Sequence, residues 1–451
     1  MLASADSMSP LNAVPQVHIQ AEVPQVPPHW TVRQLGRLGR LFKGNGGTKA
    51  DEVAEGIPCI RYGDIYTQYD FLARATRSCV DQERASEYTR IRHGDILFAA
   101  SGETLEEIGK SVANLIEGDA CCGGDLIVFR PSVDADARFL GYATDCQAAR
   151  SQKSRMGRGM TVMHIYGDQL KRLWIALPPR DEQRTIADFL DRETERIDTL
   201  VAKKQRLIEL LQENRTALIN HAVTRGLNPD APMKDSGIEW FGRIPNDWAV
   251  LPLKRVASVR YGLGQPPAEL AEGVPIVRAT DVSRGVISKE GMLRVDPNDV
   301  PKTRDAFLAT GEIIVVRSGA YTGDSAIVPE HLAGCVAGYD MVVRVRAADA
   351  SFIGWHLLAV DVRVAQWEPL MLRAAQPHLN AEELASTLIC CPPEYEQRRI
   401  AAHIARETDR LTELCQREKE LTSLLLEYRS ALITAAVTGQ IDVREYAKEA
   451  N

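Results

Sequence analysis

The sequence predicts an α+β fold in which two similar strand-rich domains are separated by two long helices. These helices are expected to pair as an antiparallel intramolecular coiled coil with pseudo-two-fold symmetry. One observation behind this prediction is an internal repeat: PPRDEQRTIADFLDRETERIDTL at 178–200 returns as PPEYEQRRIAAHIARETDRLTEL at 392–414. The other is that no proline or glycine follows these double prolines until Gly226 and Gly439. An uninterrupted stretch of this kind favours a long helix.

The repeat extends through both halves of the chain. VPPHWTVRQL at 26–35 matches IPNDWAVLPL at 244–253, and HGDILFAASG at 93–102 matches TGEIIVVRSG at 310–319. Beyond the double prolines, RTALINHAVTRG at 215–226 matches RSALITAAVTGQ at 429–440. The spacing between matching segments is nearly constant, which indicates one duplicated unit.

Short runs of valine and isoleucine predict the strand-rich domains. Examples are DILFAA, DLIVFRP, EIIVVRS and MVVRVR, which glycine, proline or aspartate bound. The expected organisation is a disordered tail at 1–25, a first domain at 26–179, a long helix at 180–226, an irregular linker at 227–243, a second domain at 244–393, a second long helix at 394–438 and a C-terminal tail at 439–451.

The long helices carry apolar residues at seven-residue spacing, a narrow stripe that favours a coiled-coil partner. The other helix of the same chain is the simplest partner, and self-association between molecules is the alternative. Lys204 and Asn214 fall on the expected seam, as do Glu418 and Tyr428. The seam residues are Leu190, Ile197, Leu200, Leu207, Leu211 and Leu218 in the first helix, and Ile404, Leu411, Leu414, Leu421, Leu425 and Leu432 in the second.

Composition sets limits on location and class. The chain has 451 residues, of which 45% are hydrophobic and 25% charged, as in ordinary globular proteins of two or three domains. It has no apolar run long enough for a bilayer and no signal-like start, so a cytoplasmic location is expected. Nine irregularly spaced cysteines predict reduced thiols. The net charge of −7 leaves nucleic-acid binding open, because local clustering of basic residues decides it.

Catalytic and cofactor motifs are not recognisable. GETLEEIGKS at 102–111 has six residues between its glycines, whereas a phosphate-binding loop needs about four. The glycines at 44–47 and 262–264 do not continue into a dinucleotide-binding pattern. We find no nucleophile with a base and no metal-ligand spacing, so an enzymatic function has little support.

Basic segments favour nucleic-acid binding. SQKSRMGRGMTVMH at 151–164 contains Lys153, Arg155 and Arg158 without an acidic residue, and its glycines would let the backbone approach a phosphate. The matching segment at 370–378 contains Arg373, Gln376 and His378. A solvated loop or a packed structural histidine is an equally good interpretation. For Arg61 and Arg278 we favour ion pairs with Asp64 and Asp281.

Two divergent domains held apart by stiff helices could read two short, different sequences on a duplex. Equivalent faces of a duplex recur about every 34 Å. Arg, Lys, Asn and Gln side chains would contact base edges, and other basic groups would contact phosphates.

The chain resembles the specificity subunit of type I restriction-modification systems. The resemblance rests on the PP-x-x-EQ-x-x-I phrase before each long helix, on AVTRGLNPDAPMKDSGIEWFGRIPNDW at 222–248 and on ALITAAVTGQIDVRE at 431–445. It implies a non-catalytic subunit with two target recognition domains, each reading one half of a bipartite, asymmetric DNA site with a fixed spacer. The resemblance also implies that two methylation subunits and two restriction subunits are partners, and that S-adenosylmethionine, ATP and magnesium belong to them.

Binding residues are transferred by region, because recognition loops vary within the family. In the first domain the expected DNA-binding residues are Lys43, Asn45, Lys49, Arg61, Tyr62, Thr67, Ser101, Lys153, Arg155, Arg158 and His164. In the second they are Tyr261, Gln265, Arg278, Thr280, Arg317, Ser318, Tyr321, Thr322, Arg373, Gln376 and His378. A stand-alone DNA-modifying enzyme and a coiled-coil scaffold are the alternatives.

Overall fold

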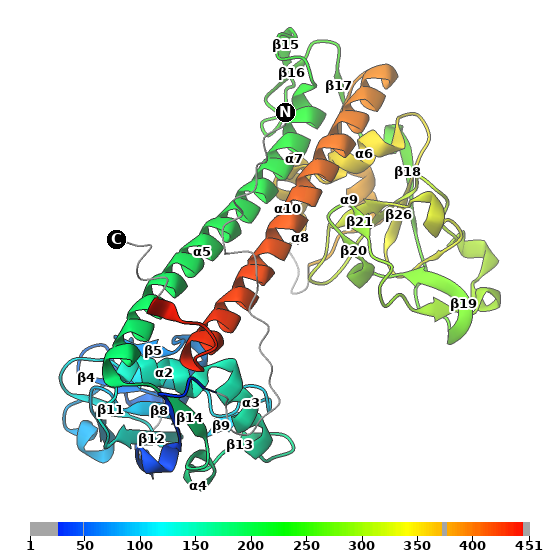
Figure 1. The fold of residues 1–451 in the computed structure, drawn as a ribbon. Coiled ribbons are helices and arrows are strands. Elements are labelled where there is room, and N and C mark those ends of the chain that lie inside the picture. Colours follow the sequence, from blue (N-terminus) through cyan, green and yellow to red (C-terminus); the bar gives the residue numbers. More distant parts are fainter. Residues whose placement is uncertain (1–25, 48, 372–376, 445–451) are drawn as a thin grey trace, which may run out of the picture. The chain divides into compact units, whose positions relative to one another are not determined.

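The computed structural model describes residues 26–47, 49–371 and 377–444. These residues form two compact units (Figure 1). Unit 1 consists of the described residues within 1–204 and 420–451, and unit 2 consists of those within 205–419. The long helices α5 (Arg180–Arg225) and α10 (Glu394–Val437) each contribute to both units.

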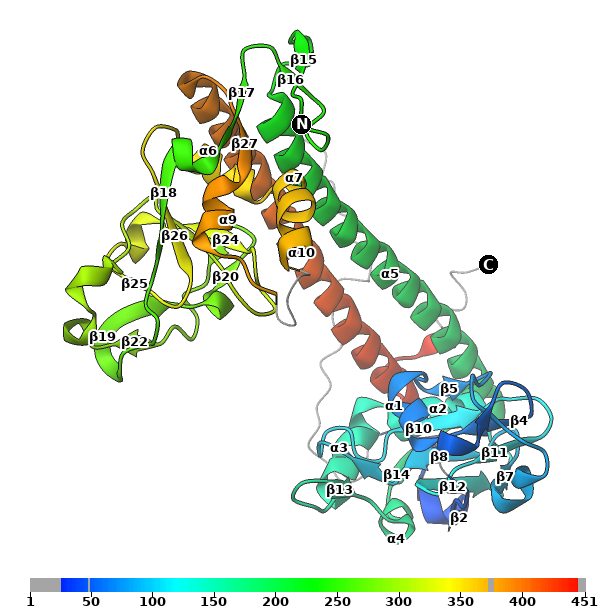
Figure 2. The same ribbon diagram turned by 180° about the vertical axis from the view of Figure 1, so that it is seen from behind.

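Unit 1 is built on two five-stranded sheets with the orders β2-β12-β8-β10-β5 and β3-β6-β4-β11-β7 (Figure 2). Its strands are β1 (Thr31–Gln34), β2 (Gly39–Lys43), β3 (Glu52–Val53), β4 (Ile57–Ile60), β5 (Leu72–Ala73), β6 (Cys79–Val80), β7 (Thr89–Ile91), β8 (Ile96–Ala99), β9 (Ser101–Gly102), β10 (Ser111–Asn114), β11 (Ala120–Cys122), β12 (Leu126–Pro131), β13 (Met163–His164) and β14 (Trp174–Leu177). The short helices are α1 (Tyr62–Thr67), α2 (Ala137–Asp145), α3 (Gln147–Met156) and α4 (Gly167–Leu170).

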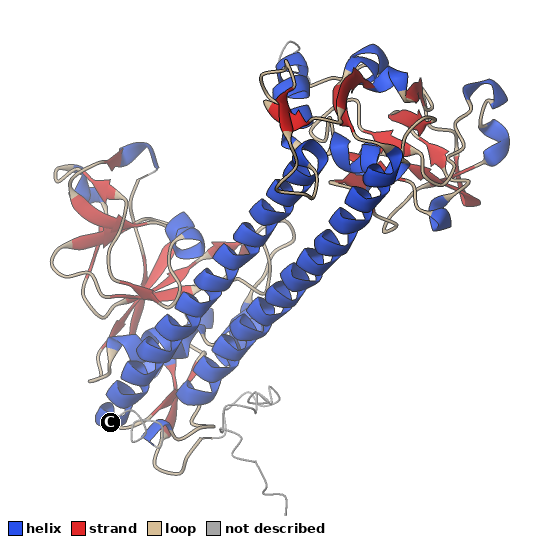
Figure 3. Ribbon diagram, turned by 90° about the horizontal axis from the view of Figure 1, so that it is seen from above, coloured by secondary structure: helices blue, strands red, loops and turns tan. Residues whose placement is uncertain are grey.

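Figure 3 distinguishes the strands, in red, from the helices and loops. Unit 2 has a four-stranded sheet of order β18-β26-β23-β24 and a three-stranded sheet of order β22-β19-β25. Its strands are β15 (Met233–Asp235), β16 (Arg243–Pro245), β17 (Ala249–Pro252), β18 (Ala257–Tyr261), β19 (Glu269–Val277), β20 (Val282–Ser283), β21 (Val286–Ile287), β22 (Arg294–Val295), β23 (Ile313–Val315), β24 (Ser325–Ile327), β25 (Val336–Ala337), β26 (Met341–Val345) and β27 (Leu388–Cys391). The short helices are α6 (Ala350–Leu357), α7 (Val360–Val362), α8 (Glu368–Met371) and α9 (Ala381–Ser386).

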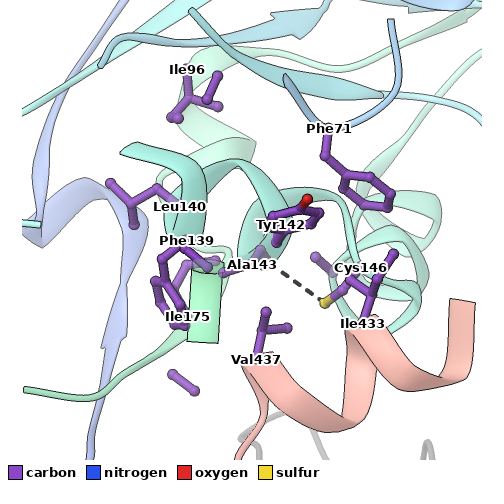
Figure 4. Close-up of a cluster of buried hydrophobic side chains, with 14 of the residues drawn as sticks. Phe71, Ile96, Phe139, Leu140, Tyr142, Ala143, Cys146, Ile175, Ile433 and Val437 are labelled. Atoms are coloured by element: carbon purple, nitrogen blue, oxygen red, sulfur yellow. Dashed lines mark hydrogen bonds between the residues drawn. The ribbon is translucent and has the colours of Figure 1, made fainter. Parts of the chain in front are cut away.

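The two long helices run antiparallel. In unit 1 the start of α5 and the end of α10 share one core, in which Leu190 of α5 and Ile433 of α10 are fully buried. Figure 4 shows Ile433 and Val437 of α10 beside Tyr142 of α2 in this core. In unit 2 the end of α5 and the start of α10 pack together in the same way, through Val223 and Ile404. The predicted fold class is therefore confirmed, with the helices paired within the chain.

Matching hydrogen bonds hold the start of each long helix. The side-chain amide of Gln183 accepts a 2.9 Å bond from the backbone N–H of Asp136, and that of Gln397 accepts a 2.8 Å bond from the backbone N–H of Asp349. These two aspartates cap the N-termini of α2 and α6. The repeated PP-x-x-EQ phrase thus joins each long helix to its neighbouring domain.

Each long helix also holds a tryptophan from the start of its domain. The indole N–H of Trp30 donates to Glu182 over 3.1 Å, and that of Trp248 donates to Glu396 over 3.1 Å. Both rings are buried, and an indole N–H buried without a partner would cost free energy. The glutamate of the repeated phrase therefore fixes the strand that enters each domain.

Two thirds of the expected seam residues lie on the inner face of their helix. These buried or half-buried residues are Leu190, Ile197, Leu211, Leu218, Ile404, Leu411, Leu425 and Leu432. They recur at seven-residue spacing, as the sequence predicts.

The seam has a second set of positions in each heptad, and these were predicted one residue too early in the sequence. The leucines that are exposed instead of facing inward are Leu200, Leu207, Leu414 and Leu421. In α5 the inward positions belong to Val201, which is half-buried, and to Ile208, which is 3% exposed. A helix of about 3.6 residues per turn allows steps of three or four residues. Leucines occupy the positions three residues after the first set of seam residues. The structure instead turns inward the positions four residues after them, which include polar residues and are therefore harder to recognise in the sequence.

Neither a membrane-spanning helix nor a cluster of metal-ligating side chains occurs among the described residues. No helix there is long and apolar enough to cross a membrane. The same residues contain no group of three or more His, Cys, Asp or Glu side chains that could hold a metal ion.

Candidate nucleic-acid interfaces

In unit 1, most of the sequence-predicted residues follow strands that end at one edge of a sheet. Strands β2 and β8 both pair antiparallel with β12, so the segments after Lys43 and after Ala99 leave the sheet on the same side. In the other sheet β4 and β11 pair in parallel, which brings Arg61 next to the loop at Gly123. Loops gathered at strand ends are a common place for binding residues.

The loop after β2 presents polar side chains to solvent. Its backbone is held at Asn45, whose N–H donates to the Thr89 hydroxyl over 2.7 Å and whose carbonyl accepts from the Thr89 N–H over 2.8 Å. The side chains of Lys43, Asn45 and Lys49 are exposed. A held backbone with free donors suits contacts to phosphates or base edges.

Arg61 begins α1, but its ion pair differs from the expected one. Its backbone N–H donates to Asp64 over 2.9 Å, whereas its guanidinium lies 3.3 Å from Glu52. The expected ion pair between Arg61 and Asp64 is therefore wrong, because the guanidinium of Arg61 pairs with Glu52 instead. The next residue, Tyr62, is half-buried with its ring 5.3 Å from that of Tyr66. Burial, together with nearby carboxylates, raises the pKa of the Tyr62 phenol.

The exposed hydroxyl of Thr67, at the end of α1, donates to the carbonyl of Gly63 over 2.8 Å. This bond is local to the helix and leaves the oxygen able to accept another hydrogen bond.

Ser101, Arg158 and His164 are brought together by backbone pairing. Strand β13 pairs with β9, so His164 lies opposite Ser101, with 3.1 Å between its Nδ1 and the serine hydroxyl. Arg158 exchanges two backbone hydrogen bonds with His164, of 3.0 and 2.7 Å. The exposed side chains of Arg158 and His164 therefore stand on one short hairpin.

Lys153 corrects the prediction for the basic segment. This segment is not a loop throughout, because its first residues lie in α3. The Lys153 side chain is 0% exposed, and its ammonium donates to Asp145 over 2.6 Å and to the carbonyls of Gly109 and Thr144. Burial lowers the pKa of this ammonium despite the adjacent carboxylate. Lys153 is a core residue, whereas Arg155 on the same helix is exposed.

Unit 2 presents its residues at the corresponding sheet edge. Arg317 follows β23, and its guanidinium carbon lies 4.7 Å from the ring centre of Tyr261 and 4.1 Å from that of Tyr339. The guanidinium is thus held between two aromatic rings, which restricts its orientation. The backbone N–H of Arg317 donates to the buried carboxyl of Asp340 over 3.2 Å. Burial raises the pKa of that carboxyl to about 6.

Ser318 and His378 reproduce the pairing of unit 1. They form an antiparallel backbone bridge, as Ser101 and His164 do. Tyr321 nearby is 48% exposed, whereas Thr322 is buried and donates its hydroxyl to the carbonyl of Gly319. The expectation of a surface role for Thr322 is therefore corrected to a structural one.

The remaining predicted residues of unit 2 differ in their surroundings. Gln265 and Thr280 are exposed. The guanidinium of Arg278 forms the expected ion pair with Asp281, at 3.1 Å. Arg373 and Gln376 lie outside the described residues.

Sequence reasoning missed two exposed tyrosines. Tyr339 is 48% exposed and covers Arg317, and Tyr166 is 61% exposed with its ring 6.5 Å from that of His164. Tyr339 stands between a glycine and an aspartate just before β26, where unit 1 has Gly124. Comparing the two repeats at this position could have identified it.

Several known proteins are similar to this chain. Residues 27–210 match the family model described as the type I restriction modification DNA specificity domain. A candidate specificity subunit of the type I restriction enzyme MjaX from Methanocaldococcus jannaschii is 26% identical, with 94% of this chain and 96% of that protein covered. The specificity subunit of the type I restriction enzyme EcoKI from Escherichia coli K12 is 21% identical, with 84% and 82% covered.

Solved structures share the fold. A chain from a structure concerned with complex assembly and conformational transition of the type I R-M system has a TM-score of 0.69 and 17% identity, covering 92% of this chain and 100% of that chain. The HsdS subunit from Thermoanaerobacter tengcongensis has a TM-score of 0.53 and 17% identity, covering 92% and 98%.

Proposed function

We propose that this chain, which belongs to the family of type I restriction-modification specificity subunits, reads the two halves of a bipartite, asymmetric DNA site. The observation that carries the proposal is the recurrence of one surface in both units. The Ser101 and His164 pair of unit 1 returns as Ser318 and His378 in unit 2, each beside the loops that follow the central strands. Two equivalent surfaces on one chain suit two half-sites.

We further propose that the half-sites differ in sequence. Around the shared serine and histidine the two units present different side chains. Unit 2 holds Arg317 between Tyr261 and Tyr339, whereas the position of Tyr339 in unit 1 is Gly124. A guanidinium with a fixed plane is suited to guanine, which presents two acceptors in the major groove. We assign the two recognition domains to residues 26–179 and 244–393.

The chain itself would be non-catalytic. S-adenosylmethionine, ATP and magnesium would be bound by methylation and restriction subunits, two of each. This assignment accords with a sequence in which no catalytic or cofactor-binding motif is recognisable. A stand-alone enzyme would methylate or cut DNA without partners, so activity of the purified chain alone would contradict the proposal.

The exposed leucines of the long helices suit the docking of these partners. Leu200, Leu207 and Leu210 on α5 are 42%, 42% and 45% exposed. The same positions of the repeat in α10 carry Leu414, Leu421 and Leu424, at 37%, 44% and 55%. Exposed apolar stripes commonly mark protein interfaces. We propose that each stripe receives one methylation subunit, while the paired helices set the length of the unread spacer.

Methylation mapping would test the proposed function. DNA is exposed to this chain together with its methylation partner, and modified adenines are then located by sequencing. The expected motif has two parts separated by a fixed gap, with one modified adenine in each part, on opposite strands. A continuous palindromic motif would contradict two-part reading. Failure of the assembled complex to bind any duplex would contradict the DNA role altogether.

A further inference from the structure

The two units treat one repeated arginine differently. Arg429 of α10 and Arg215 of α5 occupy the same position of the repeat, in RSALI and RTALI. In unit 1 Arg429 donates to two carboxylates: its Nη1 lies 2.7 Å from Asp70, and its Nη2 lies 3.1 Å from Asp198. The charge of this largely buried guanidinium is thus compensated twice.

Arg215 lacks both carboxylates. Thr412 takes the position of Asp198 in the repeat, and the turn at Arg284 lies beside Arg215 where unit 1 has Asp70 beside Arg429. Arg215 instead donates to the backbone carbonyl of Arg284 over 3.2 Å. Within the described ranges it forms no ion pair with a carboxylate. Burial and the neighbouring Arg284 lower the pKa of Arg215, which reflects a charge without full compensation.

The apolar neighbours of this arginine also differ between the two units. In unit 1 Phe71 fills the place next to Arg429, and its ring lies 5.1 Å from that of Tyr142 in α2 (Figure 4). The equivalent of Tyr142 in α6 is Trp355, and the residue that faces it is Gly285. A Cβ atom at Gly285 would already lie 3.0 Å from Leu358, and the Arg215 guanidinium carbon lies 6.0 Å from the Trp355 ring centre, so these two side chains occupy the place that Phe71 fills in unit 1.

Beside Arg215 lies an open cleft of about 580 Å³. Its walls include Ile219, Leu358 and Val364, of which Val364 is 52% exposed. Its positive groups include Arg215 and Arg284, and none of the described residues that line it is acidic. The cleft thus combines apolar walls with uncompensated positive charge.

The backbone at Arg284 adds an independent indication. Arg284 and Gly285 form the two-residue turn between β20 and β21, with φ angles of 42° and 94°. Such a turn favours Asn or Asp before glycine, and a long side chain there is conformationally costly. A strained arginine beside a second arginine is more easily explained by a ligand than by the fold.

We propose that this cleft binds an acidic peptide segment of a partner protein, in which an Asp or Glu carboxylate adjoins a large aromatic side chain. The carboxylate would pair with Arg215 and Arg284, and the aromatic side chain would lie against the apolar walls of the cleft. A duplex phosphate fits less well, because it brings no apolar group to the apolar walls. The inference stands on the cleft and goes beyond the proposed DNA function.

A peptide from this chain itself is the suitable probe. The hexapeptide Gln-Tyr-Asp-Phe-Leu-Ala has the sequence of residues 68–73, of which Asp70 and Phe71 contact Arg429 in unit 1. Its binding to the full chain is measured by fluorescence anisotropy, beside peptides with Asp replaced by Asn or Phe replaced by Ala. We expect saturable binding of the first peptide and at least about tenfold weaker binding of the other two.

Variants of the chain identify the site. Arg215→Gln should weaken binding of the acidic peptide at least about tenfold, with a much smaller effect on the Asn peptide. Arg284→Asp should weaken it similarly, because an internal carboxylate then pairs with Arg215. This variant suits the turn and should also raise the melting temperature, which shows that the fold is intact. Arg410→Gln, an exposed arginine of α10 outside the cleft, is the matched control and should have no effect.

Several outcomes would overturn the proposal. These are no saturable peptide binding by the wild-type chain, equal losses in Arg215→Gln and Arg410→Gln, or equal binding of the Asp and Asn peptides. Displacement of the peptide by random-sequence duplex DNA would identify a phosphate ligand and would also overturn it. Duplex binding by the same variants is measured separately. It should be unchanged, so failure of this inference is distinguishable from failure of the DNA function.

Discussion

Gln183 of α5 accepts a hydrogen bond of 2.9 Å from the backbone N–H of Asp136, the residue that caps α2. The same side chain donates to the carbonyl of Pro178 over 2.9 Å, and both bonds are buried. One glutamine thus joins the last strand of the domain, the start of the long helix and the start of α2. Gln397 makes the equivalent bonds in unit 2.

Replacement of this glutamine should destabilise unit 1. Gln183→Ala leaves a buried N–H and a buried carbonyl without partners, and each costs about 1–3 kcal/mol. We expect the free energy of unfolding to fall by about 3 kcal/mol, with the earliest loss of hydrogen-exchange protection in α2. Arg184→Ala, at the exposed neighbouring position, is the control and should change it by less than about 0.5 kcal/mol. Equal effects of the two variants would contradict this role of Gln183.

The corrected seam of the long helices predicts a contrast between neighbouring residues. Ile208 is 3% exposed and Leu207 is 42% exposed. Ile208→Ala should lower the free energy of unfolding by about 2–4 kcal/mol because it leaves a cavity. Leu207→Ala should cost less than about 1 kcal/mol because the side chain is already in water. Denaturant unfolding of both variants measures the difference, and the reverse order would restore the seam first expected from the sequence.

The sequence was sufficient for the architecture and insufficient for side-chain surroundings. The repeated phrase predicts both long helices because its prolines, glutamate and glutamine act locally. The role of Lys153 is not visible in the same way, since its partner Asp145 and the carbonyl of Gly109 approach it only in the folded unit. Likewise, the Tyr339 ring covers Arg317 through tertiary packing, and only comparison of the two repeats hints at its position.

Lys153 and its neighbours in the basic segment should respond differently to substitution. Lys153→Met breaks a buried ion pair and should lower the free energy of unfolding by about 3 kcal/mol. Arg155→Ala with Arg158→Ala, both exposed, should leave unfolding nearly unchanged. The arginine pair should instead weaken duplex binding and reduce the magnitude of its salt slope by about 2, as expected for two lost phosphate contacts. Unchanged duplex binding would remove both arginines from the interface.

The buried carboxyl of Asp340 predicts a pH dependence of stability. Its pKa is raised to about 6 in the folded chain and is about 3.9 when unfolded. Between these values the folded state holds the proton and the unfolded state does not. Stability from this group is therefore present below about pH 4 and is lost as the pH rises through about 6. Asp340→Asn stays neutral, so its stability relative to wild type should increase from pH 4 to 7 by up to about 3 kcal/mol.

Thermal or denaturant unfolding at a series of pH values measures this difference. The buried His356 titrates in the same range, with a pKa lowered to about 4 by burial. It is common to both chains, and its contribution cancels in the comparison. A constant difference between Asp340→Asn and wild type across this range would show that the Asp340 pKa is not raised.

Arg317 offers the sharpest test of separate half-site reading. Its guanidinium plane is set by Tyr261 and Tyr339, so a planar, two-donor contact to a base is possible without further ordering of the side chain. Arg317→Ala should weaken binding of the cognate duplex about tenfold or more and relax one position in one half of the methylated motif. Arg317→Lys should weaken duplex binding similarly, because lysine keeps the positive charge but lacks the planar guanidinium. Methylation mapping with each variant measures the effect, and the half read by unit 1 should stay unchanged. Loss of sequence specificity in both halves of the methylated motif would show that Arg317 acts on assembly or stability and not on base recognition.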